Sequence, residues 1–325
     1  MRRNFERLVD ALRAAISMLS AKPGSGRAHK ALRGALLVPI FGSLLVLLRA
    51  RAALIGPLRV EGVTLDGDRF ECHLPDLIQM YLYLFGVWEP DLAALIRRRL
   101  HPGDVFVDVG ANVGFDTMIA SRQVGAHGRV VAIEASPTVC EHLRATLDRN
   151  GRPANVRVVH GAASATVGTV AVYAGPAHNV GLATTVRRGD MPQIAYVEAA
   201  PLGDLLTPDE IGRVRLIKID VEGGEVDVLE GLLACVERLP HGVEIAVEVS
   251  PLWWRDRSKN AADVLRPYLE RGFFVYTLRN NYWPWRYLWP HDVEPPHRLR
   301  DARALERPTR RLDLVLSRID AEQLD

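Results

Sequence analysis

The chain has 325 residues, of which 48% are hydrophobic and 25% charged. This composition is that of an ordinary globular protein, and it excludes the disordered, collagen-like and disulfide-scaffold classes. Lys and Arg number 41 and Asp and Glu 39, so the net charge is only +2. No nucleic-acid partner is predicted, because such domains are usually strongly basic.

The charge is unevenly distributed along the chain. Residues 1–60 hold eleven basic and two acidic residues, a net charge of +9, which leaves −7 for residues 61–325. The net charge of −7 on residues 61–325 disfavours binding to the polyphosphate backbone of a nucleic acid. The net charge of +9 on residues 1–60 favours contact with an anionic membrane surface. With three widely separated cysteines and no CxxC, the sequence favours a cytoplasmic protein.

Residues 1–60 are predicted to form a helical extension. Apolar residues recur at helical spacing through residues 1–19, and the sequence PGSG at 23–26 would end that helix. Residues 34–48 then form an uncharged run, GALLVPIFGSLLVLL, flanked by arginines. As a helix this run would span about 22 Å, short of the roughly 30 Å of bilayer hydrocarbon. A spanning helix is therefore disfavoured. A peripheral anchor at the inner face of the membrane and a helix packed on the main domain or on a second copy stay open.

Residues 61–325 are predicted to form one α/β domain. The strands expected are 104–109, 129–133, 155–159, 213–219, 244–249, 273–278 and 312–316. The helices expected are 91–100, 113–124, 138–150, 226–235 and 261–271. Two further strands, 166–173 and 193–200, form a β insertion. Strands that alternate with helices predict a mostly parallel, doubly wound sheet, in which ligands bind beyond the carboxyl ends of the strands.

The first strand of this sheet ends in a glycine-containing loop, Asp108-Val109-Gly110-Ala111-Asn112-Val113-Gly114. Glycines allow a tight turn, and the helix that follows offers free N–H groups at its start. The second strand ends in Glu134, an acid placed to accept two ribose hydroxyls. Loop and acid together predict a cofactor that contains adenosine.

The spacing of the loop distinguishes two such cofactors. Gly110-x-x-x-Gly114 departs from the G-x-G-x-x-G of dinucleotide-binding folds. The Asp108 carboxylate suits the ammonium group of a methionine moiety and would repel a pyrophosphate. S-adenosylmethionine (SAM) is therefore favoured, and an NAD-dependent oxidoreductase remains the alternative.

Three segments, VFVDVGANVGFDTMIA, VVAIEASP and LIKIDVEGGEVDVLEG, resemble the FkbM family of SAM-dependent methyltransferases. The resemblance covers about residues 80–280 and implies a Rossmann-like class I methyltransferase fold. It also implies a set of cofactor-binding residues: Asp108, Gly110, Ala111, Asn112 and Gly114 at the methionine end, Glu134 and Ala135 at the ribose, Ala162 at the adenine, Asp220 beside SAM, and Glu89 at the cofactor entrance.

The acceptor implied by the resemblance is a hydroxyl of a small molecule, a sugar or a lipid-linked glycan. Alignment of such a reaction is worth roughly 7–11 kcal/mol, and a base adds about 10²–10⁴-fold. Candidate bases follow the fourth and fifth strands: Asp220 in KIDVEGGE and Glu248 in AVEVSP. Alternatively, Asp220 positions SAM and Glu248 caps the next segment. Asp220, Glu222 and Glu248 could hold Mg²⁺, but no further acid cluster is evident, and no metal is predicted.

Five of the six tryptophans lie between residues 253 and 289. Such side chains stack on sugars, and they equally pack cores and interfaces. The stretch NNYWPWRYLWPHDVEPPHR suits a lid over the acceptor. His178 and Asn179 fall at the substrate edge of the family and are expected to be loop residues. A homo-oligomer, and a non-catalytic membrane-associated protein with a methyltransferase fold, stay open.

Overall fold

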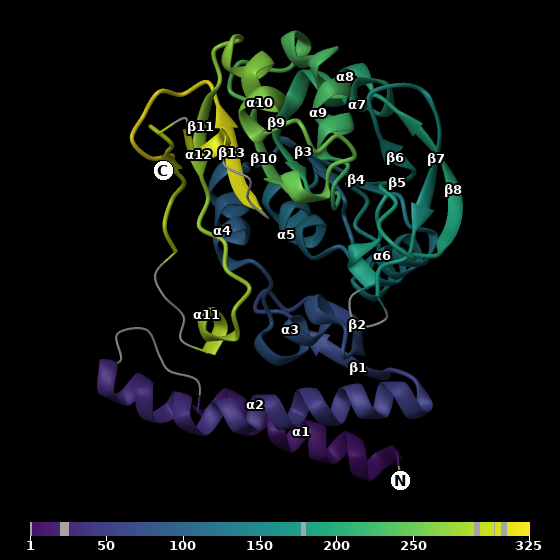
Figure 1. Ribbon diagram of the computed structural model, residues 1–325, viewed down its shortest axis with the longest axis vertical. Helices are drawn as coiled ribbons and strands as arrows, with labels where there is room; N and C mark the ends of the chain where they lie inside the picture. The colour runs from purple at the N-terminus through teal and green to yellow at the C-terminus, as the bar shows by residue number, and fades with distance from the viewer. Residues whose placement is uncertain (1, 20–25, 177–179, 289–292, 302, 307–310) are drawn as a thin grey trace. The chain divides into compact units, whose positions relative to one another are not determined.

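A computed structural model of the protein describes residues 2–19, 26–176, 180–288, 293–301, 303–306 and 311–325. The chain divides into two compact units (Figure 1). The first contains residues 1–90 and 281–293, and the second contains 91–176, 180–280 and 294–325. The boundary falls after Pro90, whereas the sequence predicted it near residue 60.

The first unit combines helices with one β-hairpin. Its elements are α1 (Arg2–Leu19), α2 (Arg27–Ile55), β1 (Leu58–Val63), β2 (Arg69–Leu74), α3 (Leu77–Phe85) and α11 (Pro284–Leu288). Strands β1 and β2 pair antiparallel, and α3 packs on both of them and on α1. Residues 61–90 belong to the same unit as the N-terminal helices because the β1–β2 hairpin and α3 bury apolar side chains against one another and against α1.

Helix α2 is longer than the uncharged run that suggested it. It extends seven residues beyond each end of residues 34–48 and continues through Pro39 and Gly42. Its 29 residues correspond to about 43 Å at 1.5 Å per residue. By length and composition, Arg33–Ile55 could cross a membrane, and only 11% of its most apolar window is buried. The length argument against a spanning helix was therefore wrong, because the helix does not end where the charges begin.

The second unit is built on an eight-stranded sheet of order β12-β11-β13-β10-β9-β3-β4-β5. The strands are β3 (Val105–Val109), β4 (Arg129–Glu134), β5 (Val156–His160), β9 (Val214–Ile219), β10 (Glu244–Val249), β11 (Phe274–Thr277), β12 (His297–Arg298) and β13 (Leu312–Ser317). From β5 to β10 all neighbours are parallel, and β13 pairs antiparallel with β10 and β11. The chain moves outward from β3 to β5 and returns to β9 beside β3, so the predicted doubly wound sheet is confirmed and its switch point lies between β3 and β9.

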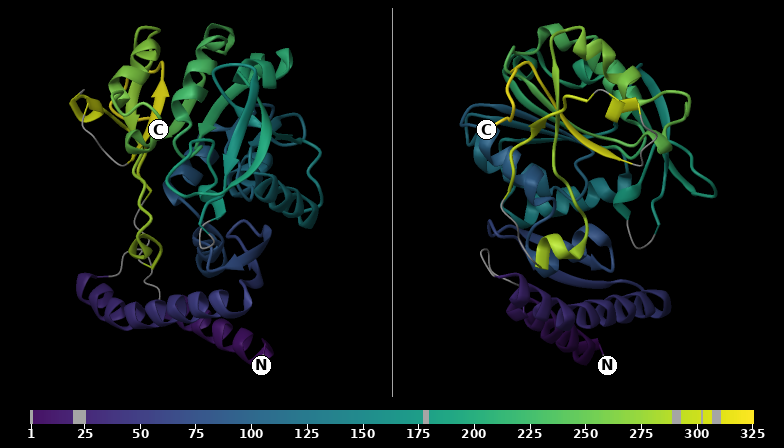
Figure 2. Two further views of the ribbon diagram at one scale, coloured as in Figure 1. Left: turned by 45° about the vertical axis from the view of Figure 1, so that its right-hand side comes forward. Right: turned by 60° about the vertical axis from the view of Figure 1, so that its left-hand side comes forward.

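Helices cover both faces of this sheet. They are α4 (Pro90–Arg99), α5 (Phe115–Val124), α6 (Pro137–Arg149), α7 (Leu202–Leu205), α8 (Pro208–Arg213), α9 (Glu225–Leu233), α10 (Ala261–Leu269) and α12 (Arg303–Glu306), with three short 3-10 turns at 180–182, 236–238 and 251–253. Helices α4 and α5 lie on one side and α9 and α10 on the other (Figure 2).

The two faces of the sheet differ in chemistry because strand side chains alternate. Val107, Ile217 and Val247 belong to a continuous apolar cluster with α9 and α10. The intervening positions, Asp108 and Lys218, face the side of α5 and are paired in register. The charged residues of the central strands are thereby gathered on one face.

The predicted β insertion forms a sheet of its own. Strands β6 (Ala162–Ala163), β7 (Gly168–Tyr173) and β8 (Gln193–Ala200) have the order β6-β8-β7. Their small apolar cluster contains Ala162, Val172, Val197 and Ala199. Strand β6 also contacts β4, which places this sheet beside the end of the strand that carries Glu134.

Candidate active site

The loop between β3 and α5 is held tightly against its neighbours. The N–H groups of Gly110 and Ala111 both donate to the Ile133 carbonyl, at 2.9 and 3.0 Å. Gly110 has φ +79°, and a Cβ there would lie 1.8 Å from the Asp220 carbonyl oxygen. Only glycine fits such a position. The loop is therefore fixed between the ends of β4 and β9, at the switch point of the sheet.

The second half of the loop leads into helix α5. Gly114 is its N-cap residue, with φ +92°, and a Cβ would lie 2.6 Å from Leu143 Cδ1 on α6. Asn112 has φ +51°, and its Oδ1 accepts a hydrogen bond from the Val113 N–H at 2.8 Å. The predicted methionine-binding residues thus form one compact turn at the start of a buried helix.

Glu134 lies directly against this turn. Its Oε2 accepts the Asn112 N–H at 2.9 Å, and its Oε1 accepts the Ser136 N–H at 2.8 Å. Burial raises the pKa of this carboxyl to about 6, against the lowering effect of the two hydrogen bonds. Each carboxylate oxygen retains a lone pair for a further donor. The two motifs predicted to hold opposite parts of one cofactor are therefore in contact.

Ala135 and Ala162 occur together near Glu134. Ala135 packs, partly buried, on the apolar cluster that contains Ala162. The Gly161 N–H donates to the Glu134 carbonyl at 3.1 Å. The structure thus brings the residues expected at the ribose and at the adenine to the same place, and their roles stay a prediction.

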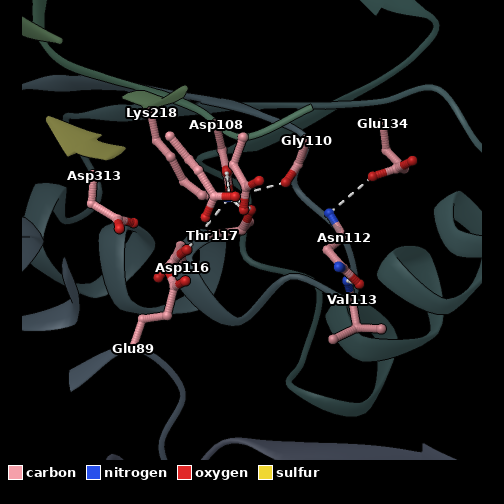
Figure 3. A network of polar contacts seen from close by, with 12 residues as sticks. Glu89, Asp108, Gly110, Asn112, Val113, Asp116, Thr117, Glu134, Lys218 and Asp313 are labelled. Carbon is pink, nitrogen blue, oxygen red and sulfur yellow. Dashed lines mark hydrogen bonds and ion pairs between the residues drawn. The ribbon is translucent and has the colours of Figure 1, made fainter. Parts of the chain in front are cut away.

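Asp108 is fully buried and bonded at both oxygens. Thr117 Oγ1 donates to its Oδ2 at 2.6 Å, and Lys218 Nζ donates to its Oδ1 at 3.2 Å (Figure 3). Lys218 Nζ also donates to the Gly110 carbonyl at 3.0 Å. Through these two hydrogen bonds, the Asp108 side chain links β3 to Lys218 of β9 and to Thr117 of α5. Its contact with the ammonium group of SAM stays a prediction.

A second carboxylate at this place, Asp116, was missed by the sequence argument. Its Oδ2 is 3.6 Å from Lys218 Nζ, and its Oδ1 has no hydrogen-bond partner among the described residues. Burial raises the pKa of Asp116 to about 7, opposed by Lys218 and assisted by Asp108 and Asp220. The signal was present as an acid in the first turn of the helix that follows the glycine loop.

Asp220 completes this cluster from the end of β9. Its Oδ2 is 3.8 Å from Lys218 Nζ, and its side chain is 29% exposed. Lys218 lies two residues before Asp220 along the chain, and this distance shows that the two side chains lie on the same face of the sheet. Three carboxylates therefore surround one lysine, and Asp220 is the most exposed of the three.

Glu248 lies in a neighbouring charged group on β10. It pairs across the sheet with Asp313 of β13, and Arg311 Nε is 3.7 Å from Glu248 and 3.1 Å from Asp313. Ser250 Oγ lies 3.5 Å from Glu248 Oε1. Burial raises the pKa of Asp313, and Asp220 adds to this effect. The sequence did not indicate Arg311 or Asp313, because both come from the last strand region, far from every motif.

Glu225 serves the fold at the start of α9. Its carboxylate accepts the Gly223 N–H and the Trp254 Nε1–H, both at 2.8 Å. Burial raises its pKa to about 7. Glu225 thus stands in the first turn of α9, where an acid complements the helix dipole, and Trp254 lies in the apolar core. Among the described residues no group of three or more His, Cys, Asp or Glu could hold a metal ion.

Glu89 belongs to the first unit. Tyr282 Oη donates to its Oε1 at 2.5 Å, and its own N–H donates to Tyr287 Oη at 3.1 Å. Trp88 stacks on Tyr282 at 4.9 Å between ring centroids. The role of Glu89 at the cofactor entrance and the lid role of the Trp-rich stretch stay predictions. His178, Asn179 and Trp289 lie outside the described residues.

The methyltransferase FkbM domain model matches residues 108–276, slightly more than half of the chain. The chain belongs to the FkbM methyltransferase family. Its cofactor is accordingly S-adenosylmethionine, which decides against the NAD alternative. The matched region runs from Asp108 to β11 and includes the glycine loop, Glu134, Asp220 and Glu248.

Two curated relatives share part of this region. The hexuronic acid methyltransferase AglP of Haloferax volcanii is 26% identical over 164 residues, 50% of this chain and 64% of AglP. A protein-L-isoaspartate O-methyltransferase of Aeropyrum pernix is 26% identical over 185 residues, 57% of this chain and 58% of that protein. The chain therefore spans less than two thirds of the length of either relative.

Solved structures that resemble the chain include two methyltransferase-fold proteins. A methyltransferase FkbM from Methylobacillus flagellatus has 13% identity and a TM-score of 0.37, with 74% of this chain and 52% of that chain covered. Fibrillarin from Aeropyrum pernix, with natively bound S-adenosyl-L-methionine, has 13% identity and a TM-score of 0.38, with 69% and 72% covered.

Proposed function

We propose that the protein transfers the methyl group of SAM to a hydroxyl group of a sugar, in a small molecule or in a glycan that is soluble or lipid-linked. The observation that carries this proposal is the contact between the glycine loop and Glu134, beside the Lys218 carboxylate cluster. This arrangement offers an acceptor for ribose hydroxyls at Glu134, and the absence of a Cβ at Gly110 lets the loop pack directly against the Asp220 carbonyl. The relation to a hexuronic acid methyltransferase supports a sugar acceptor.

SAM, when bound, supplies a methyl group on a positively charged sulfur. The task of the protein is to align the acceptor oxygen with that methyl and to remove the hydroxyl proton. Asp220 is the proposed base, because it follows β9 at the switch point and its side chain is partly exposed. Glu248 is only 12% exposed and is paired with Arg311, which suits a positioning role better.

A carboxyl acceptor is the second candidate, because one relative is a protein-L-isoaspartate O-methyltransferase. A carboxylate is already ionised near neutral pH and needs no general base. The two acceptors therefore differ in their demand for Asp220. Substitution of this residue should impair transfer to a hydroxyl and leave transfer to a carboxylate nearly unchanged.

The first experiment is a calorimetric titration of the full chain with S-adenosylhomocysteine, with NAD as the control ligand. Transfer of labelled methyl from SAM to oligosaccharides is then compared for the wild type, Asp220→Asn and the exposed-surface control Asp209→Asn. We expect Asp220→Asn to lower kcat about 10²–10⁴-fold, with S-adenosylhomocysteine affinity within a few-fold of wild type. Equal losses of kcat and of affinity would instead assign Asp220 to cofactor binding.

We further propose that the protein is cytoplasmic and held at the inner face of the membrane by α2. Arg33–Ile55 has a mean hydropathy of 1.8, and Val46 and Leu54 are 66% and 82% exposed. An exposed apolar surface of this kind is typical of membrane contact. The basic charge of residues 1–60 would add attraction to anionic lipids.

Vesicle flotation tests this attachment. We expect the full chain to float with phosphatidylglycerol-containing vesicles, and the variant Leu36→Asp/Val46→Asp/Leu54→Asp to remain in the soluble fraction. Val167, just before β7 in the β insertion, is 75% exposed. Val167→Asp is therefore the matched control, and this variant should float like the wild type. Flotation of the triple variant at the wild-type level would contradict attachment through α2.

A further inference from the structure

A cavity in the second unit has a strongly basic lining. It measures about 800 Å³ and is formed by residues 186–189, which precede β8, and by residues 252–255 and Arg257, which follow β10. Four of its nine lining residues are arginines, two are tryptophans and none is acidic: Val186, Arg187, Arg188, Gly189, Leu252, Trp253, Trp254, Arg255 and Arg257. We refer to it as the arginine cavity.

Arg188 is the most constrained of these arginines. Its guanidinium lies 3.9 Å from the centre of the Trp253 ring, and its Nη2 donates to the Glu222 carbonyl. Its Nε is buried and has no hydrogen-bond partner within the described part of the chain. A buried N–H without an acceptor is costly, and the cost is recovered when a ligand supplies one. The position suits an anionic oxygen.

The neighbouring arginines add positive charge to the lining, while the Glu222 and Glu225 carboxylates act on Arg188 from nearby. Arg255 donates to the Thr185 carbonyl at 3.0 Å and lies 4.0 Å from the Asp227 carboxylate. Arg187 and Arg257 are exposed at the cavity wall. Guanidinium groups recognise carboxylates and phosphates with two parallel hydrogen bonds. An aromatic ring in the same wall is suited to packing against a sugar.

The arginine cavity is linked to the proposed acceptor site by direct contacts. Thr184 Oγ1 donates to the Glu222 carbonyl at 2.7 Å, and Arg188 bonds the same oxygen. Glu222 lies two residues after Asp220. At the other end of this segment, a Cβ on Gly181 would lie 2.4 Å from Asn112 Nδ2 of the cofactor loop. Arg188 lies seven positions after Gly181, so the segment spans at most about 25 Å.

We infer that the arginine cavity binds an anionic group of the acceptor, so that the substrate is an acidic glycan. This inference rests on the proposed function. The anion is either the carboxylate of a uronic acid or a phosphate on a lipid-linked sugar. Both present two or more oxygens to a guanidinium fork, and both would supply the acceptor that Arg188 Nε lacks. The cavity selects the substrate and leaves the methyl transfer itself to the cofactor site.

Direct binding tests the cavity without requiring turnover. The full chain, saturated with S-adenosylhomocysteine, is titrated with a glucuronate-terminated oligosaccharide, with its neutral glucose-terminated counterpart, and with a sugar phosphate. We expect the neutral sugar to bind roughly ten-fold or more weakly than an acidic one, because charge-assisted hydrogen bonds are lost. Tighter binding of glucuronate identifies the carboxylate as the recognised anion, and tighter binding of the sugar phosphate identifies the phosphate.

Variants locate that binding. Arg188→Gln should weaken binding of the preferred acidic sugar by about ten-fold or more, and Arg187→Gln/Arg257→Gln, at exposed positions, should weaken it without affecting the fold. Arg149→Gln, an exposed arginine at the end of α6, is the matched control. Unchanged acidic-sugar affinity in the double variant and in a folded Arg188→Gln protein would overturn the inference.

Activity measurements then separate this inference from the proposed function. If methyl transfer occurs, the arginine variants should raise KM for the acidic glycan while kcat and S-adenosylhomocysteine affinity stay within a few-fold of wild type. If acidic sugars bind but no methyl is transferred to them, the proposed function is rejected and the anion site is still supported. Transfer with the same KM for acidic and neutral sugars would reject the anion site alone.

Discussion

Replacement of Asp116 by Asn tests the electrostatics of the carboxylate cluster around Lys218. Burial raises the pKa of Asp116 from its ordinary value of 3.8 to about 7. Because the pKa is higher in the native state, the native protein binds more protons than the unfolded chain between about pH 4 and 7. The Asp116 contribution to stability is therefore lost as the pH rises through that window. The full loss above pH 7 is about 4 kcal/mol, from about 1.4 kcal/mol per pKa unit.

Asn keeps the shape of the side chain and carries no charge at any pH. The buried Oδ1, which lacks a hydrogen-bond partner within the described residues, becomes an amide atom in an equally unsatisfied position or turns toward Lys218. Lys218 retains Asp108 and Asp220 as partners. Between about pH 5 and pH 8, the wild type should lose about 3 kcal/mol more stability than Asp116→Asn.

Differential scanning calorimetry measures this difference. For a unit of this size, about 3 kcal/mol corresponds to a change of roughly 6–12 °C in the Tm difference between variant and wild type. Asp209→Asn is the control, because Asp209 is exposed and Arg213 holds its pKa below the ordinary value, so it does not titrate in this range. A constant Tm difference between Asp116→Asn and the wild type at both pH values would refute the reasoning, as would a difference that shifts in favour of the wild type as the pH rises.

Three further substitutions have defined outcomes. Gly110→Ala places a Cβ 1.8 Å from the Asp220 carbonyl at a φ of +79°, so calorimetry should detect no S-adenosylhomocysteine binding; wild-type affinity would contradict the loop assignment. Glu134→Gln should weaken S-adenosylhomocysteine binding roughly ten-fold. In the wild type this affinity should decrease as the pH is lowered through about 6, because the Glu134 carboxyl then gains a proton. The affinity of the variant should not depend on pH in this range. Arg99→Leu removes the arginine that pairs with both carboxylate oxygens of the buried Glu244. We expect the free energy of unfolding, measured by urea titration, to fall by about 3–5 kcal/mol. A loss below about 1 kcal/mol would show that Arg215, 3.5 Å from the Glu244 carboxylate, is a sufficient partner.

The parallel sheet and its cofactor loop were predictable because their signals are local. Strands β3, β4, β9 and β10 are short and rich in apolar residues, and each ends in, or is followed by, a polar residue or a glycine. In a doubly wound sheet the carboxyl ends of such strands meet at the switch point. The proximity of Gly110 and Glu134 therefore followed from the order of the elements.

The first unit was harder to anticipate. The hairpin of β1 and β2 and helix α3 have no motif, and their side chains are buried mainly by contacts within this unit. The extent of α2 was misjudged because charged residues were assumed to end the apolar helix. Arg49 and Arg51 are good helix formers, and a backbone helix continues through them without regard to their charge.

The sequence by itself determined the alternation of strands and helices, the glycine loop with its acidic partner, and the membership of the FkbM family. Each depends on residues that lie close together in the chain or on a fixed order of elements. Only the tertiary structure decided that Lys218 faces three carboxylates, that Arg311 lies between Glu248 and Asp313, and that residues 186–189, 252–255 and 257 line one cavity rich in arginine. These contacts join residues far apart in the chain, and the pKa of a buried group depends on which charges the fold brings to it.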